Sequence, residues 1–364
     1  MSLASKLRYM SKPPRSSPNG DSTVFPMYSP PPPRKAVSSP EQHDIRARDR
    51  RRREGRKQII WVRVKEILFR VPESFFLNIP LETLRVSPSQ GLTADDPICL
   101  GGHTVAQFRY ILDAFKSYPS LNTRLMTLDQ ILTIGELSIR YNLAVLMQWF
   151  LPVLEDLVLS PATPLRKSSN VVYIRLMQLA MRYKRKDLVA SISSKWVSRM
   201  HWGELDPLSA LLFADMYGLR DLLGHACYVY LMSAEERIRS SEPIDPKERL
   251  CPRQLTYIMA GYHSLRTYHR HLRLTPPDIT AAPRCKDHTK CIAVWKFRWS
   301  AAMSRPCSLP DVDVLGHLVF IEQFLREDTL LKACLTPACK EAALKAVSEK
   351  RDMIARQLHH HFDL

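Results

Sequence analysis

Two short hydrophobic runs between Ile59 and Pro72 predict a β-hairpin. Both runs are rich in β-branched and aromatic residues, they meet at Lys65-Glu66, and Pro72 ends the second. Pro72 also suits the first position of a short helix, which Pro80 cannot continue because proline lacks the N–H group of a helix interior. Beyond a polar loop, Pro97–Leu100 is a predicted third strand.

Amphipathic helices are predicted after this strand. Thr104 is followed three residues later by Gln107, and Thr127 by Gln130, which is the spacing of a reciprocal capping box. Apolar residues recur at helical spacing behind each box. We therefore predict a small α/β module over residues 59–160. Its predicted core residues are Val62, Val64, Phe69, Val71, Phe108, Ile111, Leu112, Ile131 and Leu132.

This order of elements resembles the BTB/POZ domain, in the divergent form of fungal, mainly basidiomycete, BTB-like proteins. Ile67–Pro72 precedes an acidic loop, Thr93–Pro97, and Ile98–Phe108 then leads into a helix that ends near Tyr118-Pro119. The chain departs from the family at Gln58, where an Asp often opens the first strand. The resemblance implies a protein-interaction module that can homodimerise and that in some members docks on a cullin scaffold of a ubiquitin ligase.

The remaining chain has a helical pattern almost to its end. Three segments look alike, because Tyr141, Tyr183 and Tyr217 each end a helical pattern that is followed by a short break and another apolar-faced helix. Their spacing of 42 and 34 residues is close to the length of a two-helix unit. We predict stacked helical hairpins over residues 161–250 and a C-terminal helical region over 251–364, so the fold class is α+β. The alternative is that these tyrosines share only ordinary core packing.

Charge is concentrated near the N-terminus. The whole chain has a net charge of +17, and residues 1–58 hold 14 Lys and Arg against five Asp and Glu, with nine Pro and nine Ser. This composition predicts a disordered arm. The basic run at its end fits nuclear import, contact with nucleic-acid phosphates or a solvated linker. The run consists of Arg46, Arg48, Arg50, Arg51, Arg52, Arg53, Arg56 and Lys57.

Cysteine and histidine residues near the C-terminus are candidate zinc ligands. Cys285, His288 and Cys291 lie close together, and Cys334 and Cys339 form a second pair. Tetrahedral zinc takes four thiolate or imidazole ligands. Helices predicted at Lys290–Met303 and Val312–Phe324 would bring both cysteine pairs to one end of an antiparallel hairpin. His288 or Cys307 can replace one cysteine, and the alternative is a set of reduced, packed thiols. The Cys-His-Cys stretch before tryptophans is also similar to the C-terminal part of the fungal family.

Motifs for catalysis are missing from the sequence. We find no nucleophile elbow, no phosphate-binding glycine loop and no His-Glu-x-x-His zinc motif. His359–His361 is interpreted as a solvated tail. No signal peptide or membrane span is predicted. We expect a nuclear or cytoplasmic interaction protein that is not an enzyme. The alternative function is nucleic-acid binding through the basic arm, which would fall steeply with salt.

Overall fold

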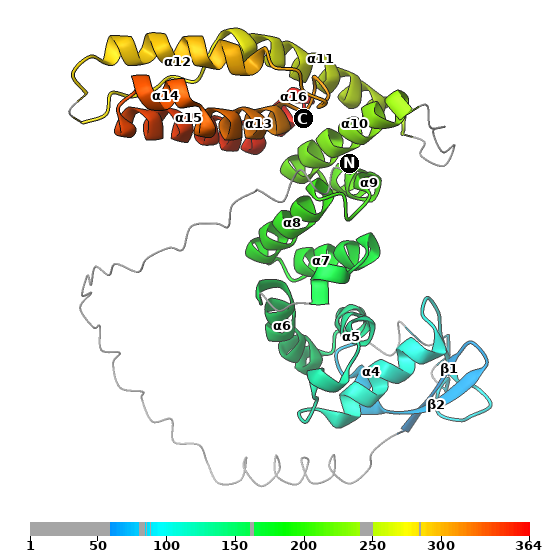
Figure 1. The fold of residues 1–364 in the computed structure, drawn as a ribbon. Helices are drawn as coiled ribbons and strands as arrows, with labels where there is room; N and C mark the ends of the chain where they lie inside the picture. The colour runs from blue at the N-terminus through cyan, green and yellow to red at the C-terminus, as the bar shows by residue number, and fades with distance from the viewer. Residues whose placement is uncertain are drawn as a thin grey trace, which may run out of the picture. The chain divides into compact units, whose positions relative to one another are not determined.

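The computed structural model of the 364-residue chain describes residues 59–79, 84, 86–87, 89–160, 164–240, 250–283 and 285–364. These residues are mostly helical, with a small mixed sheet (Figure 1). They form two compact units. Of the described residues, the sheet unit contains those from 59 to 166 together with 181–184, and the helical unit contains those in 167–180 and 185–364. The predictions for residues 1–58 lie outside the described part of the chain.

The sheet contains β1 (Ile59–Val64), β2 (Ile67–Pro72) and β3 (Ile98–Leu100), in the order β2-β1-β3. β1 and β2 form the predicted antiparallel hairpin, and β3 pairs parallel to β1. Lys65 in the turn has a φ of 53°. The hairpin and the third strand are therefore confirmed. The short helix after Pro72 is a single 3-10 turn, η1 (Glu73–Phe76).

Two helices, α4 (Val105–Ser117) and α5 (Leu128–Arg140), share a hydrophobic core with the sheet. Both begin at the predicted capping boxes. The Thr104 hydroxyl accepts from Gln107 N at 3.2 Å, and the Thr127 hydroxyl accepts from Gln130 N at 3.3 Å. Every residue predicted for this core is buried, and all except Ile131 and Leu132 belong to the core that the helices share with the sheet. The core also contains Phe75, whose ring packs against Phe76, Phe108, Phe115 and Tyr141.

Three helix–turn–helix segments follow one another along the chain, as predicted. Their helices are α5 and α6 (Ala144–Leu159), α7 (Asn170–Arg182) and α8 (Lys186–His201), and α9 (Pro207–Tyr217) and α10 (Arg220–Ser240). Short 3-10 turns, η2 (Thr123–Leu125) and η3 (Pro164–Lys167), precede α5 and α7.

The feature that the three segments share is the residue after the tyrosine. Asn142, Lys184 and Gly218 all adopt a left-handed conformation, with φ values of 48°, 56° and 66°. The backbone N–H of the next residue then bonds to the carbonyl five positions earlier, at 2.8, 3.0 and 2.9 Å. This is the Schellman arrangement, which satisfies carbonyl groups at a helix end. The tyrosines themselves differ, since Tyr141 is 3% exposed and Tyr217 39%.

The helical unit continues with a group of helices around buried tryptophans, including Trp295 and Trp299. A buried network links α10 to the start of α13. The Tyr228 hydroxyl donates to Asp313 Oδ1 at 2.6 Å, and the same carboxylate oxygen accepts from Gly316 N at 2.8 Å, which caps α13. The helices are α11 (Pro252–Leu274), α12 (His288–Met303), α13 (Val314–Glu327), α14 (Thr329–Cys334), α15 (Pro337–Arg356) and α16 (Leu358–His361).

The C-terminal histidines do not form the solvated tail that the sequence suggested. They belong to α16, and two buried residues flank them, Leu358 at 1% exposure and Phe362 at 0%. This short helix packs against α10 and α11. The interpretation failed because it weighed the three polar histidines alone, whereas the apolar residues on either side of them anchor the segment.

Candidate metal centre

Three of the candidate ligands lie at the start of α12. Cys285 is in the preceding loop, His288 is the first helical residue and Cys291 follows one turn later. Asp287 fixes the point where the helix begins, because its side chain accepts a hydrogen bond from Lys290 N at 3.2 Å. A spacing of three residues is close to one helical turn, so the His288 and Cys291 side chains project from the same side of the helix.

Cys339 joins this group from the first turn of α15. Thr336 caps that helix and accepts from Cys339 N at 3.2 Å, and Pro337 occupies its first position. Two helix N-termini therefore meet at the cluster. The partial positive charge of each N-terminus favours negatively charged groups such as thiolates.

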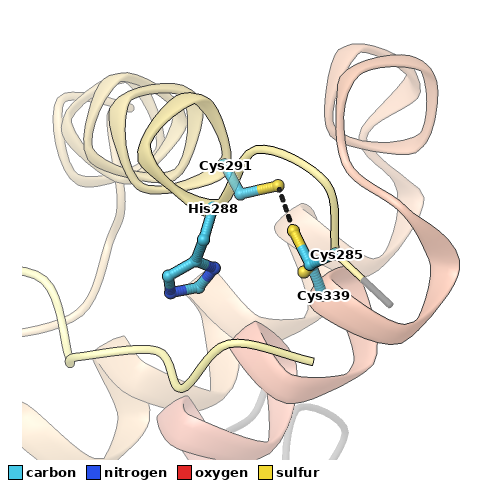
Figure 2. A group of neighbouring side chains, drawn as sticks. All are labelled: Cys285, His288, Cys291 and Cys339. Carbon is cyan, nitrogen blue, oxygen red and sulfur yellow. Dashed lines mark hydrogen bonds between the residues drawn. The ribbon is translucent and has the colours of Figure 1, made fainter. Parts of the chain in front are cut away.

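The geometry of the four side chains suits a tetrahedral metal ion. One donor atom from each of Cys285, His288, Cys291 and Cys339 lies within 4.8 Å of all the others (Figure 2). The Cys285 and Cys291 sulfurs are 3.7 Å apart. Two sulfurs bound to one zinc at the usual bond length lie about 3.8 Å apart at the tetrahedral angle. A disulfide would require about 2.05 Å. The four residues can therefore hold a metal ion.

His288 has the hydrogen bonding expected of a metal ligand. Its Nε2 lies 3.1 Å from the carbonyl oxygen of Ile279, and because a carbonyl only accepts, Nε2 carries the proton. Nδ1 then has a free lone pair. This atom is buried without a hydrogen-bond partner and faces the sulfurs (Figure 2). Ligating histidines commonly bond a backbone carbonyl through the other ring nitrogen, which fixes the tautomer.

The surroundings shift the pKa values of two of the thiols in opposite directions. The pKa of Cys339 falls to about 6, chiefly because the Thr336 hydroxyl donates to the sulfur. Burial raises the pKa of Cys291 to about 11. Cys339 is thus the first of the two to present a thiolate to a cation. The positive charge of a bound cation lowers the pKa of a thiol ligand and would let Cys291 ionise as well.

Two residues proposed from the sequence lie outside this group. Cys334 is exposed at the end of α14, and neither it nor Cys307 belongs to the cluster. Cys334 and Cys339 are separated by the break between two helices, so they do not act as a pair. His288 takes the fourth position, and its regular spacing of three residues from both Cys285 and Cys291 was the signal in favour of it.

No family model, no curated protein and no solved structure matches the chain. Among the described residues, no helix combines the length and apolar character that crossing a membrane requires.

Proposed function

We propose that this chain is a non-enzymatic interaction protein with a BTB/POZ-like sheet unit and a helical unit that a structural zinc ion stabilises. The observation that carries the zinc assignment is the buried, unpartnered Nδ1 of His288 beside three thiols. Thiolate and imidazole ligands favour zinc, and four protein donors fill its tetrahedral shell. A filled shell leaves no position for a substrate or a reactive water, which is the mark of a structural site.

Zinc at this centre would fix the segment between α11 and α12. The chain between α11 and α12 is held at Pro277, whose carbonyl accepts from Trp295 Nε1 at 2.9 Å, and at Ile279, whose carbonyl accepts from His288. Zinc would add a link from this segment to α15 through Cys285 and Cys339. The free energy of binding then contributes to folding.

Metal analysis tests the zinc assignment. We expect purified full-length protein to contain about one zinc per chain, since the four donors form a single site. Cys339→Ser should lose most of this zinc. Cys334→Ser is the matched control, because Cys334 is an exposed cysteine five residues away in the sequence. Wild-type protein without stoichiometric metal, or equal zinc loss in both variants, would contradict the assignment.

A possible catalytic pair in the helical unit does not favour an enzyme. Ser264 Oγ lies 2.9 Å from His361 Nδ1. A serine nucleophile needs its histidine to be oriented by a third group, usually a carboxylate. No carboxylate in the described part of the chain is hydrogen-bonded to His361. This pair therefore supports packing of the C-terminal segment more than nucleophilic catalysis.

The outer face of the sheet supports the interaction role. Ile59 and Leu68 are 48% and 44% exposed there. Between them the Arg70 guanidinium lies 4.7 Å from the centre of the Trp61 ring, and Arg63 donates to Cys99 Sγ at 3.2 Å. Exposed apolar side chains next to tryptophan and arginine are the composition of energetic centres in protein interfaces. We propose a second copy of the chain as the partner of this face.

Light scattering on the full chain tests self-association. We expect a dimer for the wild type and a monomer for Leu68→Glu, because the substitution places a charge in the apolar contact. Val171→Glu is the matched control, since Val171 is an exposed apolar residue on α7. A monomeric wild type would contradict dimerisation. Binding of that monomer to a purified cullin would then favour the adaptor role that the BTB/POZ resemblance implies.

The alternative function, nucleic-acid binding in the nucleus, rests on the basic residues 46–57, which lie outside the described residues. Deletion of residues 1–58 discriminates between the two functions. Nucleic-acid binding should disappear with the arm and weaken steeply with salt, whereas self-association through the sheet should persist. Both functions are compatible with the proposed nuclear or cytoplasmic location.

A further inference from the structure

The C-terminal segment, Leu358–Leu364, occupies a groove that two glycines create. A Cβ atom on Gly224 of α10 would lie 2.6 Å from the backbone nitrogen of His359. A Cβ atom on Gly261 of α11 would lie 2.1 Å from the ring of Phe362. Any other residue at these positions would push the segment away. We call this surface of α10 and α11 the glycine groove.

Imidazole groups lie within the bound segment and beside it. His359 Nδ1 lies 3.2 Å from Asp221 Oδ1, and His361 Nδ1 lies 2.9 Å from Ser264 Oγ. Beside them His225 Nδ1 of α10 lies 3.1 Å from His201 Nε2 of α8. That short contact requires at least one neutral imidazole, because two protonated rings offer no acceptor.

We propose that the C-terminal segment is an acid-sensitive latch that covers the glycine groove at neutral pH and leaves it when the imidazoles around it become protonated. The released groove would present apolar surface, since it now contacts Leu358 and Phe362.

The direction of the effect follows from the neighbouring groups. Burial lowers the pKa of His201 to about 3 and of His225 to about 4, and it also lowers the pKa of His361. An imidazole released to water has a pKa near 6.5, so at pH 5 the exposure of His225, whose pKa is about 4 in the closed state, would favour the open state by about 30-fold.

Asp221 acts in the opposite direction, because its carboxylate raises the pKa of His225 and also lies 3.2 Å from His359 Nδ1. Three further charged or titratable groups lie in or near the segment. The His360 ring is tilted against that of His359, the Tyr268 ring packs against His361, and the Lys350 ammonium lies over Tyr268. The opening therefore depends on several protonations, whose effect Asp221 partly offsets.

Hydrogen exchange on full-length protein at neutral pH and near pH 5, corrected for intrinsic exchange rates, tests the latch. We expect the amide protection factors of the C-terminal segment to be about tenfold or more lower near pH 5 than at neutral pH. Those of the sheet unit should not change. His225→Gln should reduce this pH dependence. His263→Gln is the control, because His263 is an exposed histidine on α11.

A second variant covers the case in which His225→Gln does not fold. Phe362→Ala should release the segment at neutral pH and give the exchange pattern that acid produces in the wild type. Equal protection of the segment at both pH values would overturn the latch. Loss of protection in the entire helical unit together with the segment would also overturn the latch. The same holds if His225→Gln and His263→Gln change the pH dependence equally.

Discussion

The left-handed residues after the helices allow a prediction with opposite signs at two positions. Lys184 and Gly218 occupy the same place in two Schellman turns, with φ values of 56° and 66°. Both positions are exposed, and a Cβ atom at Gly218 would meet no atom within 4 Å. Lys184→Gly and Gly218→Ala therefore change backbone preference without disturbing side-chain packing.

Two opposing effects determine the expected change in the free energy of unfolding. A residue with a Cβ atom pays about 1–2 kcal/mol in the left-handed region. Glycine loses more backbone entropy on folding, by about 0.5–1 kcal/mol. The difference favours glycine by about 1 kcal/mol. Lys184→Gly should therefore raise the free energy of unfolding by this amount, and Gly218→Ala should lower it by a similar amount.

Urea denaturation followed by circular dichroism measures both effects. Lys184→Ala is the control, and it should stay within about 0.5 kcal/mol of the wild type because both side chains carry a Cβ atom. A destabilising Lys184→Gly together with a neutral Gly218→Ala would refute the reasoning, since it would mean that side-chain contacts determine these turns.

Three further predictions concern the buried interior. Tyr228→Phe should lower the free energy of unfolding by about 1–3 kcal/mol in urea denaturation, because it removes a donor from the buried Asp313 carboxylate. Gly135→Ala should lower it by about 1–3 kcal/mol in the same assay, since the new Cβ atom would lie 2.4 Å from the Phe150 ring. Burial lowers the pKa of His269 to about 4 in the folded chain. As the pH falls below 6.5, this histidine therefore takes up a proton in the unfolded chain before it does so in the folded chain. This group should lower the free energy of unfolding by about 1.4 kcal/mol for each pH unit between pH 6.5 and 4. His269→Gln should reduce this dependence in urea denaturation measured at several pH values. An unchanged pH dependence would contradict the assignment.

The sheet unit could be predicted in detail because its signals are local. The hairpin depends on adjacent hydrophobic runs, and each capping box on residues three positions apart, such as Thr104 and Gln107. The left-handed turns were only partly visible. Gly218 is a typical residue at such a position, but Lys184 has no local preference for it. The sequence pattern was therefore defined by the tyrosine and not by the left-handed residue that follows it.

Contacts between distant residues could not be predicted from the sequence. The choice of His288 over Cys334 depends on how α14 and α15 are oriented, which no short pattern encodes. Gly261 contacts Phe362, a residue about a hundred positions later in the chain. The pattern around Gly261 indicates a helix, but it carries no information about which side chain fills the space above the glycine.

The order of the four candidate metal ligands along the chain has a consequence for biosynthesis. Cys285, His288 and Cys291 emerge from the ribosome together, and Cys339 follows Cys291 by 48 positions. At roughly 5–20 residues per second, the fourth donor is synthesised about 2–10 seconds later. During this interval the nascent chain exposes two cysteines and a histidine without their partner. The supply of metal and reductant at the time of translation would thus determine how much protein reaches the assembled helical unit.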